Sequence, residues 1–323
     1  MTQLAYILAA SHSGSTLLTM LLNSHPDIAT IGELSPGHME DTSWYRCSCG
    51  EKITECPFWD FIATTAREKE LGFRLEDFGT GFRMPASRVA ARLLRPLHRG
   101  PALELIREAA LALFSSWPAR FKDVARANEV LVQAIMEYYG AHIFVDKGNT
   151  ALRLKYLSRI PSFALKVIRL IRDGRAVALT YMDPADFADA KDAALRGGGS
   201  GGNRQDERLS MSQAAHEWRR CNEEAEHALC RFHSSQWIQV HYEELCKDPD
   251  ATLARVFAFL GLDPDQRIRD FRSVENHIVG NGMRLDTTSE IRLDERWRQA
   301  LTAKQLQTFD MVAGRMNRRY GYV

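Results

Sequence analysis

The stretch of the sequence best suited to bind a ligand is a polar turn near the N-terminus, Ser11–Thr16. It separates a short apolar run from a second apolar segment, which is typical of a strand, a loop and the start of a helix. At a helix N-terminus the free backbone N–H groups and the helix dipole favour an anion. Gly14 permits close approach of the backbone, and Ser13, Ser15 and Thr16 offer hydroxyl groups. The turn therefore predicts a phosphate or sulfate site, with a plain capped helix as the alternative.

The same turn departs from two familiar motifs. A Walker loop would have Gly at position 9 and Lys at position 15, where this chain has Ala9 and Ser15. A nucleophile elbow needs Gly two residues to either side of its Ser, but Ser13 is flanked at those positions by Ser11 and Ser15. These departures count against an ATPase or kinase and against a serine hydrolase.

A second segment suited to anions follows the strongest apolar run, residues 164–171. Arg172 comes directly after this run, and Thr180 lies two helical turns further along. Ligands of parallel α/β sheets bind beyond the carboxyl ends of the strands, so Arg172 and the first turn are expected to line one crevice. Two separated anion-binding segments predict a ligand with two anionic ends.

The elements that must position these residues alternate between strand and helix patterns. Helical patterns separate the strand-like runs, and this alternation predicts an α/β fold with a central parallel sheet. We expect one domain over residues 1–323. The strand-like runs are residues 4–10, 142–145, 164–171 and 237–240, and the helical patterns are 17–22, 151–159, 174–182 and 209–233.

Two further segments stand apart from this alternation. Residues from about 58 to 140 carry apolar positions at helical spacing broken by prolines, which predicts a helical insertion between the first and second strands. Residues 196–203 are so rich in glycine that they cannot hold one backbone conformation. A mobile lid, a plain surface loop and an engineered linker all remain open for this Gly-rich segment. We expect substrate specificity to lie in these two segments.

With both anion segments in order, the chain resembles the sulfotransferases that use 3′-phosphoadenosine 5′-phosphosulfate (PAPS), especially the branch of tyrosylprotein and carbohydrate enzymes. Residues 12–18 resemble the family's 5′-phosphosulfate loop, and residues 172–176 with Thr180 resemble its 3′-phosphate motif. Tyr242 resembles a tyrosine that holds the nucleotide, and residues 281–284 resemble the tail of many bacterial members. The resemblance implies a three-layer, P-loop-like fold with PAPS as co-substrate. It implies nucleotide contacts from His12, Ser13, Gly14, Ser15, Thr16, Leu17, Arg172, Thr180, Tyr242, Asn281, Gly282, Met283 and Arg284.

The resemblance also supplies two catalytic positions. Glu33 matches the place of the general base in tyrosylprotein enzymes, and Lys147 matches the family's catalytic lysine. Sulfonyl transfer needs in-line attack by an acceptor oxygen, removal of its proton and stabilisation of the developing charge. Glu33 would take the proton of an alcohol or phenol, Lys147 would stabilise the transferring group, and no metal is required. The alternative for Glu33 is a solvated loop acid, because no Lys or Arg lies near it in sequence.

His12 departs from the family pattern, because tyrosylprotein enzymes have an arginine at this position. We include His12 among the catalytic candidates, although histidine is only partly charged at neutral pH. The alternative is a neutral histidine that packs the loop. If His12 cannot replace the arginine, the chain would be a catalytically inactive nucleotide-binding or scaffold protein. A nucleotide-dependent kinase is a more remote alternative, since the Walker lysine is missing.

Three cysteines lie close together in sequence, at Cys47, Cys49 and Cys56. A zinc site would need a fourth ligand, and His38 is the only histidine nearby in sequence. We therefore rank zinc below a disulfide or reduced loop thiols, and we expect no metal.

The charge and hydropathy of the chain argue against some classes of binding partner. The formal net charge is only +1 over 323 residues, which argues against nucleic acid or an anionic membrane as the main partner. No apolar run approaches the roughly 18–20 residues of a membrane span. The first basic residue is Arg46, too late for the n-region of a secretory signal. We expect a cytoplasmic protein that acts on a small-molecule hydroxyl acceptor, and the sequence does not predict its oligomeric state.

Overall fold

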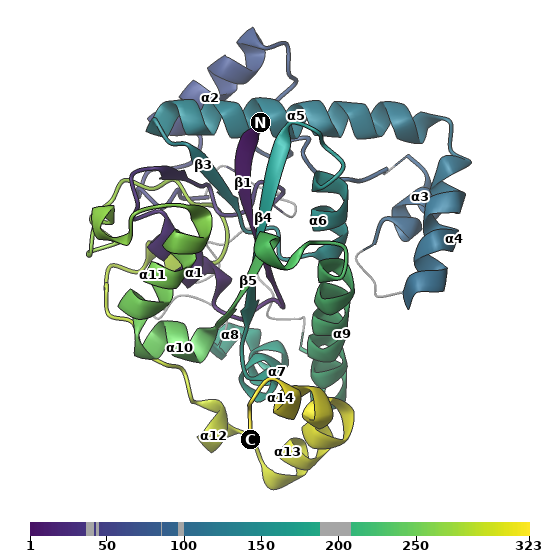
Figure 1. The fold of residues 1–323 in the computed structure, drawn as a ribbon, viewed down its shortest axis with the longest axis vertical. Helices are drawn as coiled ribbons and strands as arrows, with labels where there is room; N and C mark the ends of the chain where they lie inside the picture. The colour runs from purple at the N-terminus through teal and green to yellow at the C-terminus, as the bar shows by residue number, and fades with distance from the viewer. Residues whose placement is uncertain (37–41, 43–44, 85, 96–99, 188–207) are drawn as a thin grey trace.

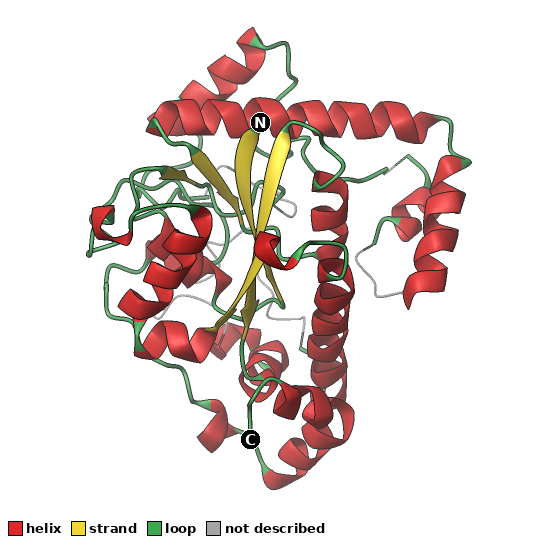
Figure 2. Cartoon of the chain, in the orientation of Figure 1, coloured by secondary structure: helices red, strands yellow, loops and turns green. Residues whose placement is uncertain are grey.

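The centre of the molecule is a five-stranded sheet in which all paired strands run parallel. The computed structural model describes residues 1–36, 42, 45–84, 86–95, 100–187 and 208–323. The strand order is β2-β3-β1-β4-β5, and Figures 1 and 2 show helices on both sides of this sheet. The predicted α/β class is confirmed. The strands are β1 Thr2–Ala9, β2 Ile28–Ala29, β3 Ile143–Asp146, β4 Phe163–Ile171 and β5 Trp237–His241.

The helices are distributed along the whole chain between and after these strands. They are α1 Ser15–Leu22, α2 Pro57–Glu68, α3 Arg88–Leu93, α4 Gly100–Ala112, α5 Ser116–Tyr139, α6 Ala151–Leu157, α7 Gly174–Met182, α8 Pro184–Phe187, α9 Met211–Leu229, α10 Tyr242–Lys247, α11 Pro249–Leu260, α12 Trp297–Ala300, α13 Ala303–Phe309 and α14 Arg315–Arg319. No helix within the described ranges is long and apolar enough to cross a membrane.

Strand β1 is buried on both faces, and its alternating side chains divide the core into two layers. Leu4, Tyr6 and Leu8 pack into a cluster with residues of α5, α6 and α9. Ala5 and Ile7 point the other way, into a cluster with residues of α1 and α11. This alternation produces the three-layer arrangement, with the sheet between two helical layers (Figure 1).

The predicted helical insertion is present as α2 to α5, but its position differs from the prediction. It follows β2 rather than β1, because the sheet contains a two-residue strand, Ile28–Ala29, that pairs with β3. Two residues are too few to leave a period-two pattern in a sequence, so this strand was missed. The long helix α5 lies across the amino-terminal ends of the strands in Figure 1.

The register of the sheet brings four loops to one edge. Tyr6 pairs with Asp146, and Ala9 pairs with Leu170, so the chain segments after β1, β3 and β4 leave the sheet at its carboxyl edge. Ile171 pairs with His241, which adds the start of α10 to the same edge. Because the chain crosses from β3 over β1 to β4, this edge contains the topological switch point where ligands of open α/β sheets bind.

Candidate functional site

The turn after β1 has the backbone of a tight anion loop. His12 has φ 64° and Gly14 has φ 86°, both in the left-handed region. A Cβ at Gly14 would lie 2.4 Å from Cδ2 of Tyr242, so only glycine lets this loop pack against that ring. The turn and α10 are therefore locked together, although more than two hundred residues separate them in sequence.

The loop presents donors that the protein itself does not use. The hydroxyl of Ser13 is buried and has no hydrogen-bond partner within the described chain. Helix α1 has no side-chain cap hydrogen bond and no acidic residue in its first turn. Buried polar groups are nearly always paired, so these donors indicate a site for an anionic ligand. Ser15, Thr16 and Leu17 begin α1 and are themselves buried.

Glu33 and Lys147, predicted separately, meet in space. Lys147 Nζ lies 2.9 Å from Glu33 Oε1 and donates to Thr16 Oγ1 at 3.1 Å. The lysine side chain is 3% exposed and that of Glu33 is 24% exposed. The predicted base and the predicted cation thus form an ion pair that also contacts the anion loop. Glu33 does have a cationic partner, which the sequence near it did not reveal.

Backbone hydrogen bonds hold the segment around Glu33 against two neighbouring elements. Lys147 N donates to Gly32 O at 2.8 Å, and Val279 N donates to Ile31 O at 2.8 Å. Gly32 has φ 77°, and a Cβ there would lie 2.5 Å from Val279 O. Glu33 therefore emerges from a backbone that is fixed on both sides.

A buried ion pair that the sequence analysis missed supports the same segment. Asp146 is fully buried and accepts from Leu34 N at 3.2 Å and from Arg153 Nε at 2.8 Å. Arg153 also donates to Asn128 Oδ1 at 2.8 Å, so its charge is well hydrogen-bonded. Asp146 precedes Lys147 and holds the residue after Glu33, so it positions both members of the ion pair. The sequence feature that could have identified Asp146 is its position as an acidic residue at the end of an apolar strand.

Arg172 lies beside the anion loop, but it already has an acidic partner. Its guanidinium donates to His12 O at 2.9 Å, forms an ion pair with Asp294 at 3.0 Å and stacks over the Tyr242 ring at 4.4 Å. Burial alone would raise the pKa of Asp294, but a hydrogen bond from Arg296 and the charge of Arg172 hold this pKa well below its usual range. Asp294 lies in a loop with no recognisable motif, so no sequence pattern identifies it.

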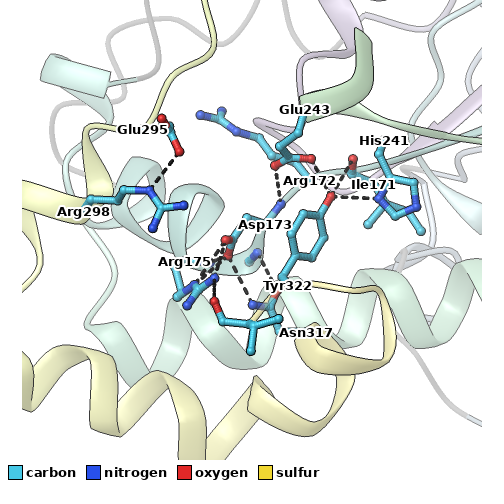
Figure 3. A network of polar contacts seen from close by, with 12 residues as sticks. Ile171, Arg172, Asp173, Arg175, His241, Glu243, Glu295, Arg298, Asn317 and Tyr322 are labelled. Atoms are coloured by element: carbon cyan, nitrogen blue, oxygen red, sulfur yellow. Dashed lines mark hydrogen bonds and ion pairs between the residues drawn. The ribbon is translucent and has the colours of Figure 1, made fainter. Parts of the chain in front are cut away.

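The N-terminus of α7, which belongs to the predicted 3′-phosphate motif, is closed by the protein itself (Figure 3). Asp173 N donates to Glu243 Oε1 at 3.0 Å, and Gly174 N donates to Asn317 Oδ1 at 2.9 Å. The hydroxyl of Tyr322 donates to Glu243 Oε2 at 2.6 Å. These contacts tie the C-terminal residues to α7 and α10. They leave the side chain of Arg172, rather than the backbone of α7, as the group in this motif that faces the anion loop.

The other predicted nucleotide residues are placed as follows. Thr180 is buried in α7 and its Oγ1 donates to Ala176 O at 3.1 Å. His12 lies edge-on to Tyr181, with ring centroids 4.8 Å apart. Tyr242 is 7% exposed, between Gly14 and Arg172.

The segment at residues 281–284 packs beside α1 as a short 3₁₀ helix, Gly282–Leu285. Asn281 Oδ1 accepts from Met283 N at 2.9 Å, and Met283 packs against the apolar cluster that contains α1. Arg284 is 2% exposed, and its guanidinium donates to Gly280 O at 3.1 Å and to Arg46 O at 2.5 Å. The structure thus gives Arg284 a role in holding backbone segments together.

Two predictions concern residues outside the described ranges. The Gly-rich segment 196–203 and His38 both lie there.

A parallel α/β sheet with a glycine-containing turn between its first strand and first helix, and a lysine–carboxylate pair beside that turn, defines a P-loop-like α/β fold. The model of the sulfotransferase family matches residues 109–266 of the chain. The matched segment contains Lys147, Arg172, Thr180 and Tyr242. This match agrees with the resemblance inferred from the two anion segments.

Individual relatives are distant. The chain is 24% identical over 168 residues to mouse carbohydrate sulfotransferase 5, a match that covers 50% of this chain and 42% of that protein, so less than half of the relative's length is matched. It is 20% identical to the sulfotransferase domain of the Synechococcus PCC 7002 olefin synthase, with a TM-score of 0.48 and coverage of 96% and 94% of the two chains. It is 15% identical to a sulfotransferase domain from the curacin biosynthetic pathway, with a TM-score of 0.47 and coverage of 100% and 99%.

Proposed function

We propose that the chain transfers a sulfonyl group from PAPS to the hydroxyl of a small alcohol or phenol. The observation that carries this proposal is the contact among Glu33, Lys147 and Thr16. In this contact a carboxylate, a buried ammonium group and the proposed anion loop lie together at the switch point of the sheet, which supports the proposal. An in-line displacement at sulfur needs a base, a cation and an anion-binding loop.

In the proposed reaction, Glu33 accepts the proton of the acceptor hydroxyl as its oxygen bonds to sulfur. The bond between sulfur and the bridging oxygen breaks, and 3′-phosphoadenosine 5′-phosphate (PAP) leaves with that oxygen. Lys147 stabilises the charge on the bridging oxygen, and it releases Glu33 as it does so. His12, whose carbonyl is held by Arg172, is proposed to face the sulfonate end of the same loop. We propose that the reaction itself needs no metal.

The residues present fit the two anionic ends of the co-substrate unequally. At the 5′ end, the orphaned hydroxyl of Ser13 and the uncapped start of α1 suit a phosphosulfate. At the 3′ end, Arg172 and Thr180 are the proposed contacts, and a phosphate bound there would have to displace Asp294 from Arg172. The ring of Tyr242 and the backbone of residues 281–284 are proposed to hold the remainder of the nucleotide.

The pair of Arg172 with Asp294 is also the observation that favours a second candidate function, a nucleotide-binding or scaffold protein without turnover. In such a protein the internal carboxylate would remain on Arg172 and the 3′-phosphate grip would stay weak. A kinase is less favoured, because Ser15 stands where the Walker lysine would be.

Transfer of radiolabelled sulfonate from PAPS to a panel of simple alcohols and phenols tests the proposal. We expect a labelled product with at least one acceptor, and loss of product by about 10²–10⁴-fold in Glu33→Gln. Glu68→Gln, an exposed acid at the end of α2, is the matched control and should leave the rate unchanged. Binding of PAP without transfer to any acceptor would instead support the scaffold function.

A further inference from the structure

A cluster of four potential metal ligands lies outside the contacts described so far. Cys47, Cys49 and Cys56 converge with His277, and their ligand atoms all lie within 4.8 Å of one another. Nδ1 of His277 is 3.3 Å from Sγ of Cys47 and 3.4 Å from Sγ of Cys56. Sγ of Cys49 is 3.7 Å from Sγ of Cys56. The fourth ligand that the sequence near the cysteines lacked thus comes from a loop 221 residues after Cys56.

Three of the six separations between the ligand atoms are close to those of a tetrahedral zinc site. With Zn–S bonds of about 2.3 Å and Zn–N bonds of about 2.0–2.1 Å, tetrahedral angles place two sulfurs about 3.8 Å apart and a sulfur and nitrogen about 3.6 Å apart. The three distances given above, 3.3, 3.4 and 3.7 Å, lie within about 0.3 Å of these values. Three thiolates and one imidazole are a ligand set typical of structural zinc.

The surroundings of His277 are also those of a metal ligand. Its second ring nitrogen, Nε2, lies 2.9 Å from Oε1 of Glu275, and its ring stacks on Phe58 at 4.4 Å and 3°. Glu275 in turn accepts from the hydroxyl of Tyr138 at 3.0 Å. A carboxylate on the far nitrogen fixes the tautomer that leaves Nδ1 free to bind a metal. His277 is 3% exposed, so its orientation is set by this packing.

The place of Cys56 in the fold favours the thiolate form that a metal requires. Cys56 is the residue before α2, where the helix dipole favours negative charge.

We propose that Cys47, Cys49, Cys56 and His277 form a structural zinc site that fastens the loop at residues 277–284 to the segment at residues 45–56. All four positions are filled by protein, so the metal would support the fold and take no part in chemistry. The geometry thus reverses the ranking that the sequence suggested, in which a disulfide came before zinc. The proposal does not depend on sulfonyl transfer.

The proposed zinc site lies in the same loop that packs against the ion pair of Glu33 and Lys147. Gly280 lies three residues after His277 in the same loop, and its backbone N donates to the hydroxyl of Tyr45 at 3.0 Å. A Cβ on Gly280 would lie 3.0 Å from Lys147 Nζ and 3.7 Å from Glu33 Oε1, so this loop packs directly against the ion pair of Lys147 and Glu33. Zinc would hold the loop in this position.

The test is the metal content of the unaltered chain, purified in reducing buffer without chelator and dialysed against buffer that contains micromolar zinc. We expect one equivalent of zinc per chain by mass spectrometry of the elements. Cobalt added to chelator-treated protein should give the visible bands of tetrahedral cobalt and a thiolate charge-transfer band. These two readouts use the unaltered chain, so they do not depend on whether a variant folds.

Variants then identify the ligands. Cys49→Ser and His277→Asn should lose zinc at stoichiometric concentrations, and Glu275→Gln should weaken zinc affinity by about 10–100-fold while it retains all four ligands. Cys230→Ser, which removes an exposed thiol elsewhere, should keep one equivalent. Less than a tenth of an equivalent of zinc in the reduced chain would overturn the proposal. A disulfide between Cys49 and Cys56, detected as four free thiols of six in unreduced denatured protein, would overturn it as well.

Discussion

Lys147 forms an ion pair with Glu33 at 2.9 Å while it donates to Thr16 at 3.1 Å, so one buried ammonium group joins the predicted base to the predicted anion loop. Taking a charged lysine out of water is costly unless it is paired. Glu33 provides that pairing when no anion is bound. An anion in the loop would compete for the same ammonium and free the carboxylate to accept a proton.

This relationship predicts that binding and turnover respond separately to a change at Glu33. Glu33→Gln should leave the affinity for PAP within about threefold of the unaltered chain, because the lysine and the loop remain, and should reduce turnover by about 10²–10⁴-fold. Calorimetry and labelled sulfonyl transfer measure the two quantities. Loss of affinity and turnover together would mean that Glu33 acts only by holding Lys147 in place.

The contact of Gly14 with the ring of Tyr242 predicts a large effect of one added methyl group. Gly14→Ala should lower thermal stability and weaken PAP binding more than tenfold, because its Cβ would collide with the ring that stacks under Arg172. Gly50→Ala is the matched control, since Gly50 has φ 95° but no atom within 4 Å of an added Cβ. Its cost should be the backbone strain alone, about 1–2 kcal/mol. Equal melting temperatures for the two variants would show that the ring contact is unimportant.

The ion pair of Asp294 with Arg172 predicts a variant with improved nucleotide affinity. Asp294→Asn removes the carboxylate that a 3′-phosphate must displace. We therefore expect PAP to bind about 3–10-fold more tightly, because the free energy of a partly exposed ion pair no longer opposes binding. Asp123→Asn, an exposed position in α5, serves as the control. Weaker PAP binding by Asp294→Asn would mean that Asp294 positions Arg172 for the ligand instead of competing with it.

The same carboxyl predicts a dependence of stability on pH. Its pKa is lower in the folded chain than the usual value near 4, so the folded state is stabilised above pH 5 and loses this contribution as pH falls. The free energy of unfolding should therefore fall more between pH 6 and pH 3.5 in the unaltered chain than in Asp294→Asn. Urea unfolding at both pH values measures this difference. Identical losses in the two proteins would contradict the assigned charge interaction.

The fold was predictable wherever a pattern was long enough to be recognised. The helix predicted over residues 174–182 has those bounds in the structure, and the four longer strands lie at the predicted runs within a few residues. Helix α9 begins at Met211, two residues later than predicted, because Ser210 and Gln213 form a capping box there. The two-residue strand β2 could be found only through its pairing with β3.

The shared location of several candidate residues was predictable, but their contacts were not. The strand ends correctly suggested that the anion loop, Lys147 and Arg172 share one edge of the sheet. The partners of these residues come from far along the chain: Asp294 reaches Arg172 across 122 positions, and His277 reaches Cys56 across 221. A search limited to neighbours in sequence could identify the three cysteines but not the histidine that approaches them. Asp294, the carboxylate that pairs with Arg172, belongs to no recognisable motif.

The most direct test of the account is a calorimetric titration of the unaltered chain with PAP, in parallel with ATP and with adenosine 5′-phosphosulfate, which lacks the 3′-phosphate. We predict that PAP binds at least tenfold more tightly than either of the others, and that Arg172→Ala removes this preference with little effect on the affinity for adenosine 5′-phosphosulfate. Such a result would mean that the anion loop and Arg172 act as two grips of one site. Equal binding of all three, or no binding, would contradict the proposed function.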